Sequence, residues 1–220
     1  MRSALCLLLA VAFTFLMIGC GRQQEPQQGP KVQKSEPPAK EAKEPAPQPA
    51  AETAPAKEPV HPMFVLRIDC GAVEDFTDPD GNVWKADHEF VEGGWGHVGG
   101  GIIVRDTIKK IDNTNLQKLY LSECFRLSAY RVTCPNGTYT VTLHFAETYR
   151  DKPGDRVFDV SIEGKRVLAA FDVVKEAGKP LTAVVKSFPD VQVADGELTI
   201  EFTELTELPM INAIEVVQTK

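Results

Sequence analysis

The sequence lacks the short motifs that mark common hydrolase active sites. It contains no Gly-x-Ser-x-Gly elbow and no His-Glu-x-x-His pair, and its four histidines are scattered. A glycosidase needs two carboxylates roughly 5 to 10 Å apart, one of them protonated. Many acidic residues are present, Glu123 and Glu147 among them, but nothing in their spacing selects such a pair. These absences favour a binding protein over an enzyme, and no cofactor is expected.

Positive charge is also scarce. The chain has 24 Lys and Arg against 31 Asp and Glu, a net charge of −7. Arg2 is the only charged residue before position 20, and residues 21–62 hold six basic and six acidic residues, so residues 63–220 carry −8. Binding to phosphate backbones needs a basic stripe, and none is visible. The negative net charge excludes nucleic acid as an expected partner and is compatible with a neutral ligand.

Aromatic residues are absent from residues 21–62, where ten prolines occur among many Ala, Gln, Glu and Lys. Such a composition cannot bury enough apolar surface to offset the entropy lost on ordering. We therefore predict a disordered, Pro-rich tether. As a polyproline helix its 42 residues would span on the order of 130 Å, and as a flexible coil about 35 to 40 Å. Either length makes it a spacer.

The chain has one apolar run of note, at its N-terminus. Arg2 is followed by apolar residues from Ala4 to Ile18, which is too short for a membrane span and predicts a secretory signal peptide over residues 1–19. The next residue completes Leu-Met-Ile-Gly-Cys20, which resembles a bacterial lipobox. We expect Cys20 to carry a lipid anchor at the bacterial cell envelope, and Gly21 favours the outer membrane. The alternative is ordinary signal cleavage and a soluble secreted protein.

Cysteine is infrequent, with five residues in the chain. Cys6 leaves with the signal peptide and Cys20 is the expected lipid site, so Cys70, Cys124 and Cys134 remain in a compartment that favours disulfides. Two of the three are expected to pair, with Cys124–Cys134 the favoured combination, and the third to stay buried as a small hydrophobic residue. The spacing is not that of a zinc finger, so no metal site is predicted.

Residues 63–220 have the pattern of many short strands with almost no helix. In residues 197–203, Leu198, Ile200 and Phe202 share one face while glutamates and threonines share the other. Two such half-buried sheets packed face to face form a β-sandwich. The β-rich segments are 64–68, 119–125, 139–145, 157–162, 184–188, 197–202 and 211–217, and turn residues stand at 135–137, 163–165 and 194–196. We predict an all-β fold.

Two loops allow more than one interpretation. Residues 92–101 are too glycine-rich for a strand; they predict either a flexible surface loop or a loop that approaches a ligand closely, with Trp95 offering a flat ring. Residues 78–89 resemble a calcium loop, with Asp78 first and Glu89 twelfth, but Val83 occupies the sixth position, where the sharp turn needs Gly. A plain turn is favoured there, and calcium stays open.

Several segments together carry a family resemblance. They are Arg-Ile-Asp-Cys-Gly at 67–71, Leu-Tyr-Leu-Ser-Glu at 119–123, Phe-Ala-Glu-Thr-Tyr at 145–149, Arg-Val-Phe-Asp-Val at 156–160 and Pro-Met-Ile-Asn-Ala-Ile-Glu-Val at 209–216. In order and spacing, over nearly all of residues 64–217, they resemble the malectin and malectin-like carbohydrate-binding domains. The resemblance implies a jelly-roll-like β-sandwich. It also implies a sugar site on loops at one end, built from four aromatic side chains and an aspartate.

The resemblance carries candidate site residues onto this chain. Tyr149 matches the first aromatic residue of a pair, and Arg150 stands where the family has the second. Phe125 stands where the family has a tyrosine, so the ring is kept without its hydroxyl group. Glu207 takes the place of the acidic residue, and Trp95 is a stand-in for the remaining aromatic residue. Flat rings pack on the C–H faces of sugars, and carboxylates accept their hydroxyl hydrogens. Because of these departures, the family's preference for an α-linked glucose disaccharide is not carried over. Arg150 suits an anionic sugar, since guanidinium binds carboxylates with paired hydrogen bonds.

Each candidate also has a structural interpretation: Phe125 as core, Glu207 as a solvated acid, and Arg156 and Asp159 as supports of a strand. The leading hypothesis is an envelope-anchored, non-catalytic carbohydrate-binding module, whose partners are a glycan and, through its lipid, a membrane. The alternative is a protein-interaction or structural module that has lost its sugar site and binds an envelope protein.

Overall fold

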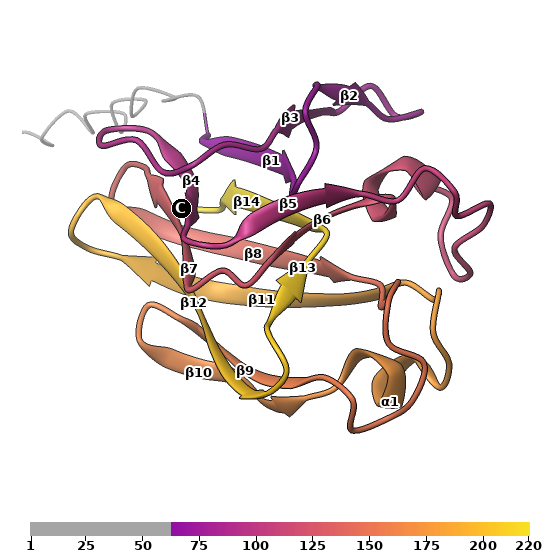
Figure 1. Ribbon diagram of the computed structural model, residues 1–220. Helices are drawn as coiled ribbons and strands as arrows, with labels where there is room; N and C mark the ends of the chain where they lie inside the picture. The colour runs from indigo at the N-terminus through magenta and orange to yellow at the C-terminus, as the bar shows by residue number, and fades with distance from the viewer. Residues whose placement is uncertain (1–62) are drawn as a thin grey trace, which may run out of the picture. The chain divides into compact units, whose positions relative to one another are not determined.

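The computed structural model describes residues 63–220, and these residues form the β-sandwich predicted from the sequence (Figure 1). The signal peptide, Cys20 and the tether predicted for residues 1–62 lie outside the described residues. The helical segments are η1 (Gln117–Tyr120), a 3-10 turn, and α1 (Val173–Ala177). Among residues 63–220, neither has the length and apolar character needed to cross a membrane. The strands are β1 (Val65–Asp69), β2 (Phe76–Thr77), β3 (Val83–Ala86), β4 (Trp95–Val98), β5 (Gly101–Val104), β6 (Ser122–Phe125), β7 (Ala129–Thr133), β8 (Gly137–Phe145), β9 (Val157–Ile162), β10 (Lys165–Phe171), β11 (Val184–Val193), β12 (Glu197–Thr206), β13 (Met210–Ile211) and β14 (Ala213–Gln218).

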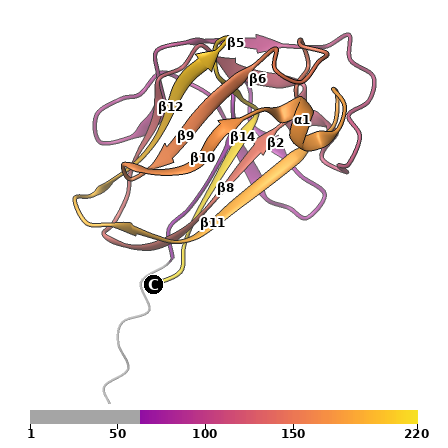
Figure 2. The ribbon, with the colours of Figure 1, turned by 90° about the horizontal axis from the view of Figure 1, so that it is seen from below.

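The strands form two large sheets and one small sheet. The first has the order β11-β8-β14-β1-β3-β2, the second β10-β9-β12-β7-β4, and the third β13-β6-β5. Figure 2 shows β9, β10 and β12 in one layer and β8, β11 and β14 in the other. The third sheet extends the edge of the sandwich, where it borders the loops that build the site described below.

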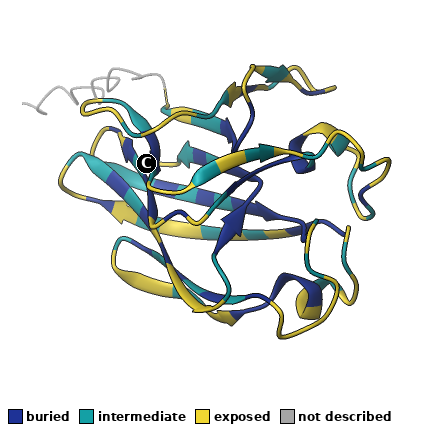
Figure 3. Ribbon diagram, in the orientation of Figure 1, coloured by how far each residue is buried: buried dark blue, intermediate teal, exposed yellow. Residues whose placement is uncertain are grey.

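The core lies between the two large sheets. Alternate residues of β8, from Tyr139 to Phe145, are fully buried, and they face the apolar residues of β9 and β12. The Phe145 and Phe158 ring centroids are 6.1 Å apart across this interface. Figure 3 shows buried residues alternating with more exposed ones along the strands. Each fully buried large apolar side chain contributes about 1.5 to 3 kcal/mol, so the period-two pattern fixes which face of each strand points inward.

Two predicted strands differ from the observed elements. In residues 119–125 the first two residues, Leu119 and Tyr120, belong to the 3-10 turn η1 and are both buried, and the strand starts only at Ser122. The strand predicted at 211–217 is interrupted at Asn212. The buried Asn212 side chain accepts a hydrogen bond from Ala146 N and donates one to the Ser122 carbonyl, tying the end of β8 to β6.

The glycine-rich segment is not a loop throughout, contrary to the prediction. It contains β4 and leads into β5. Gly96 has a φ of 146°, and a Cβ there would lie 2.5 Å from the His88 carbonyl oxygen. Glycine stands in this strand because a neighbouring backbone approaches closely.

The predicted Cys124–Cys134 disulfide is wrong. Cys70, Cys124 and Cys134 are all free and buried. All three thus pack as small hydrophobic residues.

Asp78 serves as the centre of a turn. Its Oδ1 accepts hydrogen bonds from the backbone N–H groups of Asp80 and Asn82, and its Oδ2 accepts from the side chains of Asn82 and Trp84, at 2.9 to 3.1 Å. These four bonds fill the acceptor positions of the carboxylate. Because β3 follows at Val83, the segment has the plain-turn geometry rather than that of a calcium loop.

The chain enters and leaves the domain at the same end of the sandwich. Phe64 pairs with Gln218, and Thr138, at the start of β8, donates to the Lys220 carbonyl at 2.9 Å. The far end of β8 leads into residues 146–150. This loop therefore lies at the opposite end of β8 from both ends of the domain.

Candidate functional site

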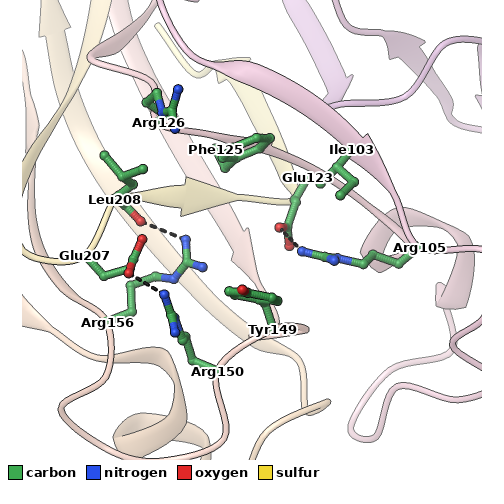
Figure 4. A pocket seen from close by; sticks show the side chains of 10 residues that line it. All are labelled: Ile103, Arg105, Glu123, Phe125, Arg126, Tyr149, Arg150, Arg156, Glu207 and Leu208. Carbon is green, nitrogen blue, oxygen red and sulfur yellow. Dashed lines mark hydrogen bonds and ion pairs between the residues drawn. The ribbon is translucent and has the colours of Figure 1, made fainter.

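A cavity of about 300 Å³ lies where the three-stranded sheet meets the loops that follow β8 and β12 (Figure 4). Its wall on the sheet side comes from β5 and β6. Register pairs Ile103 with Glu123 and Gly101 with Phe125. Since side chains two apart on a strand share a face, Glu123 and Phe125 point to the same side, and the small Gly101 leaves the Phe125 ring open to the cavity.

The loop after β8 is held in place by a buried carboxylate. Glu147 is 1% exposed, and its Oε1 accepts hydrogen bonds from the backbone N–H groups of Tyr149 and Arg150, each at 3.0 Å. Its Oε2 lies 2.8 Å from Nε of Arg156 in an ion pair. Arg156 also donates to the Leu208 carbonyl at 2.7 Å. This arrangement links the loop after β8 to the loop after β12.

The Tyr149 ring stands out from the loop into the cavity. It is 60% exposed, and two guanidinium groups lie over it, with Arg105 at 5.4 Å and Arg150 at 4.7 Å from its centroid. Arg105 is itself fixed by an ion pair with Glu123 at 3.0 Å. Thr148 completes the support by donating to Glu123 at 2.7 Å. The exposed ring is therefore positioned by charged neighbours rather than by core packing.

Two lining residues have a strained backbone. Glu207 and Arg126 have φ values of 60° and 61°, in the left-handed region that side chains other than glycine rarely adopt. The Arg126 N–H donates to the Pro209 carbonyl at 2.9 Å, and the Glu207 carboxylate pairs with Arg150. Backbone strain of this kind costs about 1 to 3 kcal/mol per residue, and five other non-glycine residues of the described domain, away from the cavity, share it.

The lining combines rings with fixed charged groups. Each lining carboxylate is paired with an arginine, Glu123 with Arg105 and Glu207 with Arg150 (Figure 4). The cavity can hold a ligand that presents a flat apolar side together with several hydrogen-bonding groups.

Four of the five residues predicted for the site line this one cavity: Tyr149, Phe125, Glu207 and Arg150. Trp95 does not. It lies on β4 opposite Val132 of β7, and its ring contacts the His88 ring, with centroids 4.0 Å apart and the planes tilted by 42°. The pairing of β4 with β7 moves Trp95 away from the three-stranded sheet that builds the cavity.

Sequence reasoning missed four charged lining residues: Arg105, Glu123, Arg126 and Arg156. Arg156 was expected to be structural, and it does support Glu147, but it also borders the cavity. Alternation around Phe125 could have indicated Glu123, since the two are on one face. Arg105 and Arg126 carry no signal in the linear sequence.

A comparison with protein families matches residues 64–215 to the Malectin domain. The chain belongs to the malectin family. The malectin domain is a binding module.

Relatives include a probable leucine-rich repeat receptor-like serine/threonine-protein kinase of Arabidopsis thaliana, 34% identical over 167 residues, which covers 63% of this chain and 16% of the kinase. A second such kinase of the same plant is 38% identical over 81 residues, covering 34% of this chain and 8% of the kinase. The malectin-family chain thus spans a small part of these relatives.

Solved structures with the same fold include a Bacteroides uniformis beta-glucuronidase, with a TM-score of 0.65 and 23% identity over 71% of this chain and 18% of the glucuronidase. The ANX1 ectodomain from Arabidopsis thaliana has a TM-score of 0.58 and 17% identity, covering 70% of this chain and 48% of the ectodomain. At these identities the likeness establishes the fold alone.

Proposed function

We propose that the malectin domain binds an oligosaccharide in the cavity around Tyr149 without changing it chemically. The observation that carries this proposal is the convergence of Tyr149, Phe125, Glu207 and Arg150 on one cavity at the loop end of the sandwich. Two rings offer apolar faces to sugar C–H groups, while the carboxylate and guanidinium groups offer acceptors and donors to hydroxyl groups.

The placement of Tyr149 supports a binding role. A ring that is 60% exposed adds little to the core, yet a buried ion pair between Glu147 and Arg156 fixes the loop that presents it. Preorganised side chains of this kind lose little conformational entropy when a ligand arrives. The rigid loop therefore favours recognition.

The charges of the cavity bear on which sugar is bound. Arg105, Arg126, Arg150 and Arg156 line it, against Glu123 and Glu207. Arg126 has no ion pair among residues 63–220, whereas Arg150 is already paired with Glu207. A sugar carboxylate would meet Arg126 directly and would compete with Glu207 for Arg150. The ligand class therefore extends from neutral to acidic oligosaccharides.

We also propose that a lipid on Cys20 anchors the chain at the bacterial cell envelope, with residues 21–62 as the spacer. The domain is entered at the end of β8 opposite the cavity. Mass spectrometry of the wild-type chain and of Cys20→Ser tests this: the variant is expected to lose the acyl mass. An identical mass, apart from the substitution, would exclude lipidation.

The alternative function is protein recognition. It is supported by the two guanidinium groups over the Tyr149 ring, which leave less of its surface free for a sugar. A glycan array followed by calorimetric titration separates the two functions. Binding of a neutral or acidic oligosaccharide at up to millimolar concentration supports the sugar site, and absence of binding to every glycan tested supports the protein ligand.

A further inference from the structure

A second cluster of polar side chains lies apart from the sugar cavity. Asp87 follows β3, His97 is on β4 and Cys124 is on β6, and one ligand atom from each lies within 4.8 Å of the others. His97 is 6% exposed and Cys124 is fully buried, while Asp87 is half-buried. None of the three lines the cavity around Tyr149. The cluster is therefore a separate site, formed by the neighbouring Asp87 and His97 segments together with Cys124.

His97 is oriented as a metal ligand would be. Its Nδ1 lies 2.9 Å from the Gly99 carbonyl oxygen. Because a carbonyl oxygen only accepts hydrogen bonds, Nδ1 carries the proton and Nε2 keeps its lone pair. Metal-binding histidines commonly donate their second ring N–H to a backbone carbonyl, which fixes both tautomer and ring orientation. Among residues 63–220, Nε2 has no hydrogen bond.

Asp87 is held by three hydrogen bonds and keeps one acceptor position. Its Oδ2 accepts from Gly71 N at 2.8 Å and from the Tyr130 hydroxyl at 2.7 Å, and its Oδ1 accepts from His88 N at 2.9 Å. A carboxylate has about four acceptor positions. Within the described residues no Lys or Arg pairs with Asp87, so a half-buried negative charge lacks a cation.

We propose that Asp87, His97 and Cys124 bind one divalent transition-metal cation, with Zn²⁺ the preferred ion. One oxygen, one imidazole nitrogen and one sulfur form a donor set that zinc accepts and that magnesium or calcium, which need all-oxygen sites, do not. Cys124 binds as the thiolate and releases its proton to solvent. The carboxylate and the thiolate then neutralise the two charges of the cation, and the fourth tetrahedral position is left to water on the exposed side of Asp87.

Such an ion would tie Cys124 of the third sheet to the Asp87 and His97 segments, which are themselves already joined by the hydrogen bond from His97 N to the His88 carbonyl. Asp87 follows β3 in the first sheet, His97 belongs to the second sheet and Cys124 to the third. Because the folded site would bind the ion and the unfolded chain would not hold it in this geometry, binding would raise the stability of the domain.

The proposal is tested on the untagged full chain, kept reduced, by titration with Zn²⁺ and separately with Co²⁺. Matched variants are Cys124→Ser and Cys134→Ser, which each remove one buried thiol. Wild type and Cys134→Ser are expected to bind one ion per chain, to show the thiolate-to-cobalt absorption band and to unfold at a higher temperature with Zn²⁺. Cys124→Ser is expected to lose the band and at least tenfold in affinity.

His97→Gln provides a second variant in case Cys124→Ser fails to fold, and it is expected to show the same loss of affinity with the thiol intact. Absence of stoichiometric binding by the wild type would overturn the proposal and identify the cluster as a hydrogen-bonded core network. The proposal would also be overturned if Cys134→Ser lost as much metal affinity as Cys124→Ser, or if Cys124→Ser or His97→Gln bound the metal as well as the wild type does.

Discussion

Changing Glu147 to Gln should destabilise the domain strongly, because this side chain lies at the base of the candidate sugar site. In the wild type, Oε1 accepts two backbone N–H groups at 3.0 Å and Oε2 pairs with Arg156 at 2.8 Å. A glutamine has one oxygen and one NH₂ group. Whichever way the amide turns, a donor faces a donor, either the Arg156 guanidinium or the two backbone N–H groups.

The magnitude follows from burial. Glu147 and Arg156 are 1% and 6% exposed, and removing one partner of a buried ion pair costs about 3 to 5 kcal/mol. That is a large part of the roughly 5 to 15 kcal/mol that stabilises a typical domain. Because Tyr149 and Arg150 are positioned by the same carboxylate, glycan affinity should fall in parallel.

The assay is urea unfolding followed by tryptophan fluorescence, with the exposed Glu204→Gln as the control, expected to change stability by at most about 0.5 kcal/mol. A double-mutant cycle with Arg156→Met assigns the loss. The double variant should be about 1 to 3 kcal/mol more stable than the sum of the single losses predicts. A Glu147→Gln variant within about 1 kcal/mol of wild type, or strictly additive losses, would refute the reasoning.

Two further predictions concern stability. Burial lowers the pKa of His144 to about 4, against about 6.5 in the unfolded chain, so its contribution is fully present above pH 6.5 and is lost as pH falls toward 4. In urea titrations across that pH range, the free energy of unfolding of His144→Phe should fall by about 3 kcal/mol less than that of the wild type. The same dependence of stability on pH in both proteins would contradict this. Gly71 and Gly81 have φ values of 83° and 86°, but a Cβ overlaps the Glu123 carbonyl only at Gly71. Both alanine variants carry about 1 to 2 kcal/mol of strain. Thermal melts should therefore show Gly71→Ala clearly below Gly81→Ala, and equal melting temperatures would disprove the overlap.

The strands that the sequence predicted well are those with a clean apolar alternation. Residues 139–145 lie within β8, 157–162 coincide with β9, and 197–202 begin β12. The turn at Glu163 and Gly164 joins β9 to β10 with positive φ at both residues, 50° and 67°, as a two-residue hairpin requires. In these places local propensity and tertiary packing favour the same structure.

The sequence-based predictions failed where contacts between residues far apart in the sequence determine the structure. Gly96 stands in a strand because the His88 backbone approaches it, and glycine content alone suggested a loop. Tyr149, Phe125 and Glu207 could be found from motifs at loop ends. Arg105 could not, since its place beside Glu123 depends on the register of β5 against β6. The proposed metal ligands likewise come from three segments whose proximity no spacing indicates.

The central claim, that the exposed ring of Tyr149 belongs to a sugar site, is tested most directly by calorimetric titration of Tyr149→Ala with the best oligosaccharide found for the wild type. Leu205→Ala is the control, since Leu205 is exposed on β12 and does not line the cavity. Removal of a central aromatic contact typically costs about 1 to 2 kcal/mol, a factor of roughly 5 to 30. The account predicts that loss for folded Tyr149→Ala and unchanged affinity for Leu205→Ala. Equal affinities for wild type and folded Tyr149→Ala would contradict it.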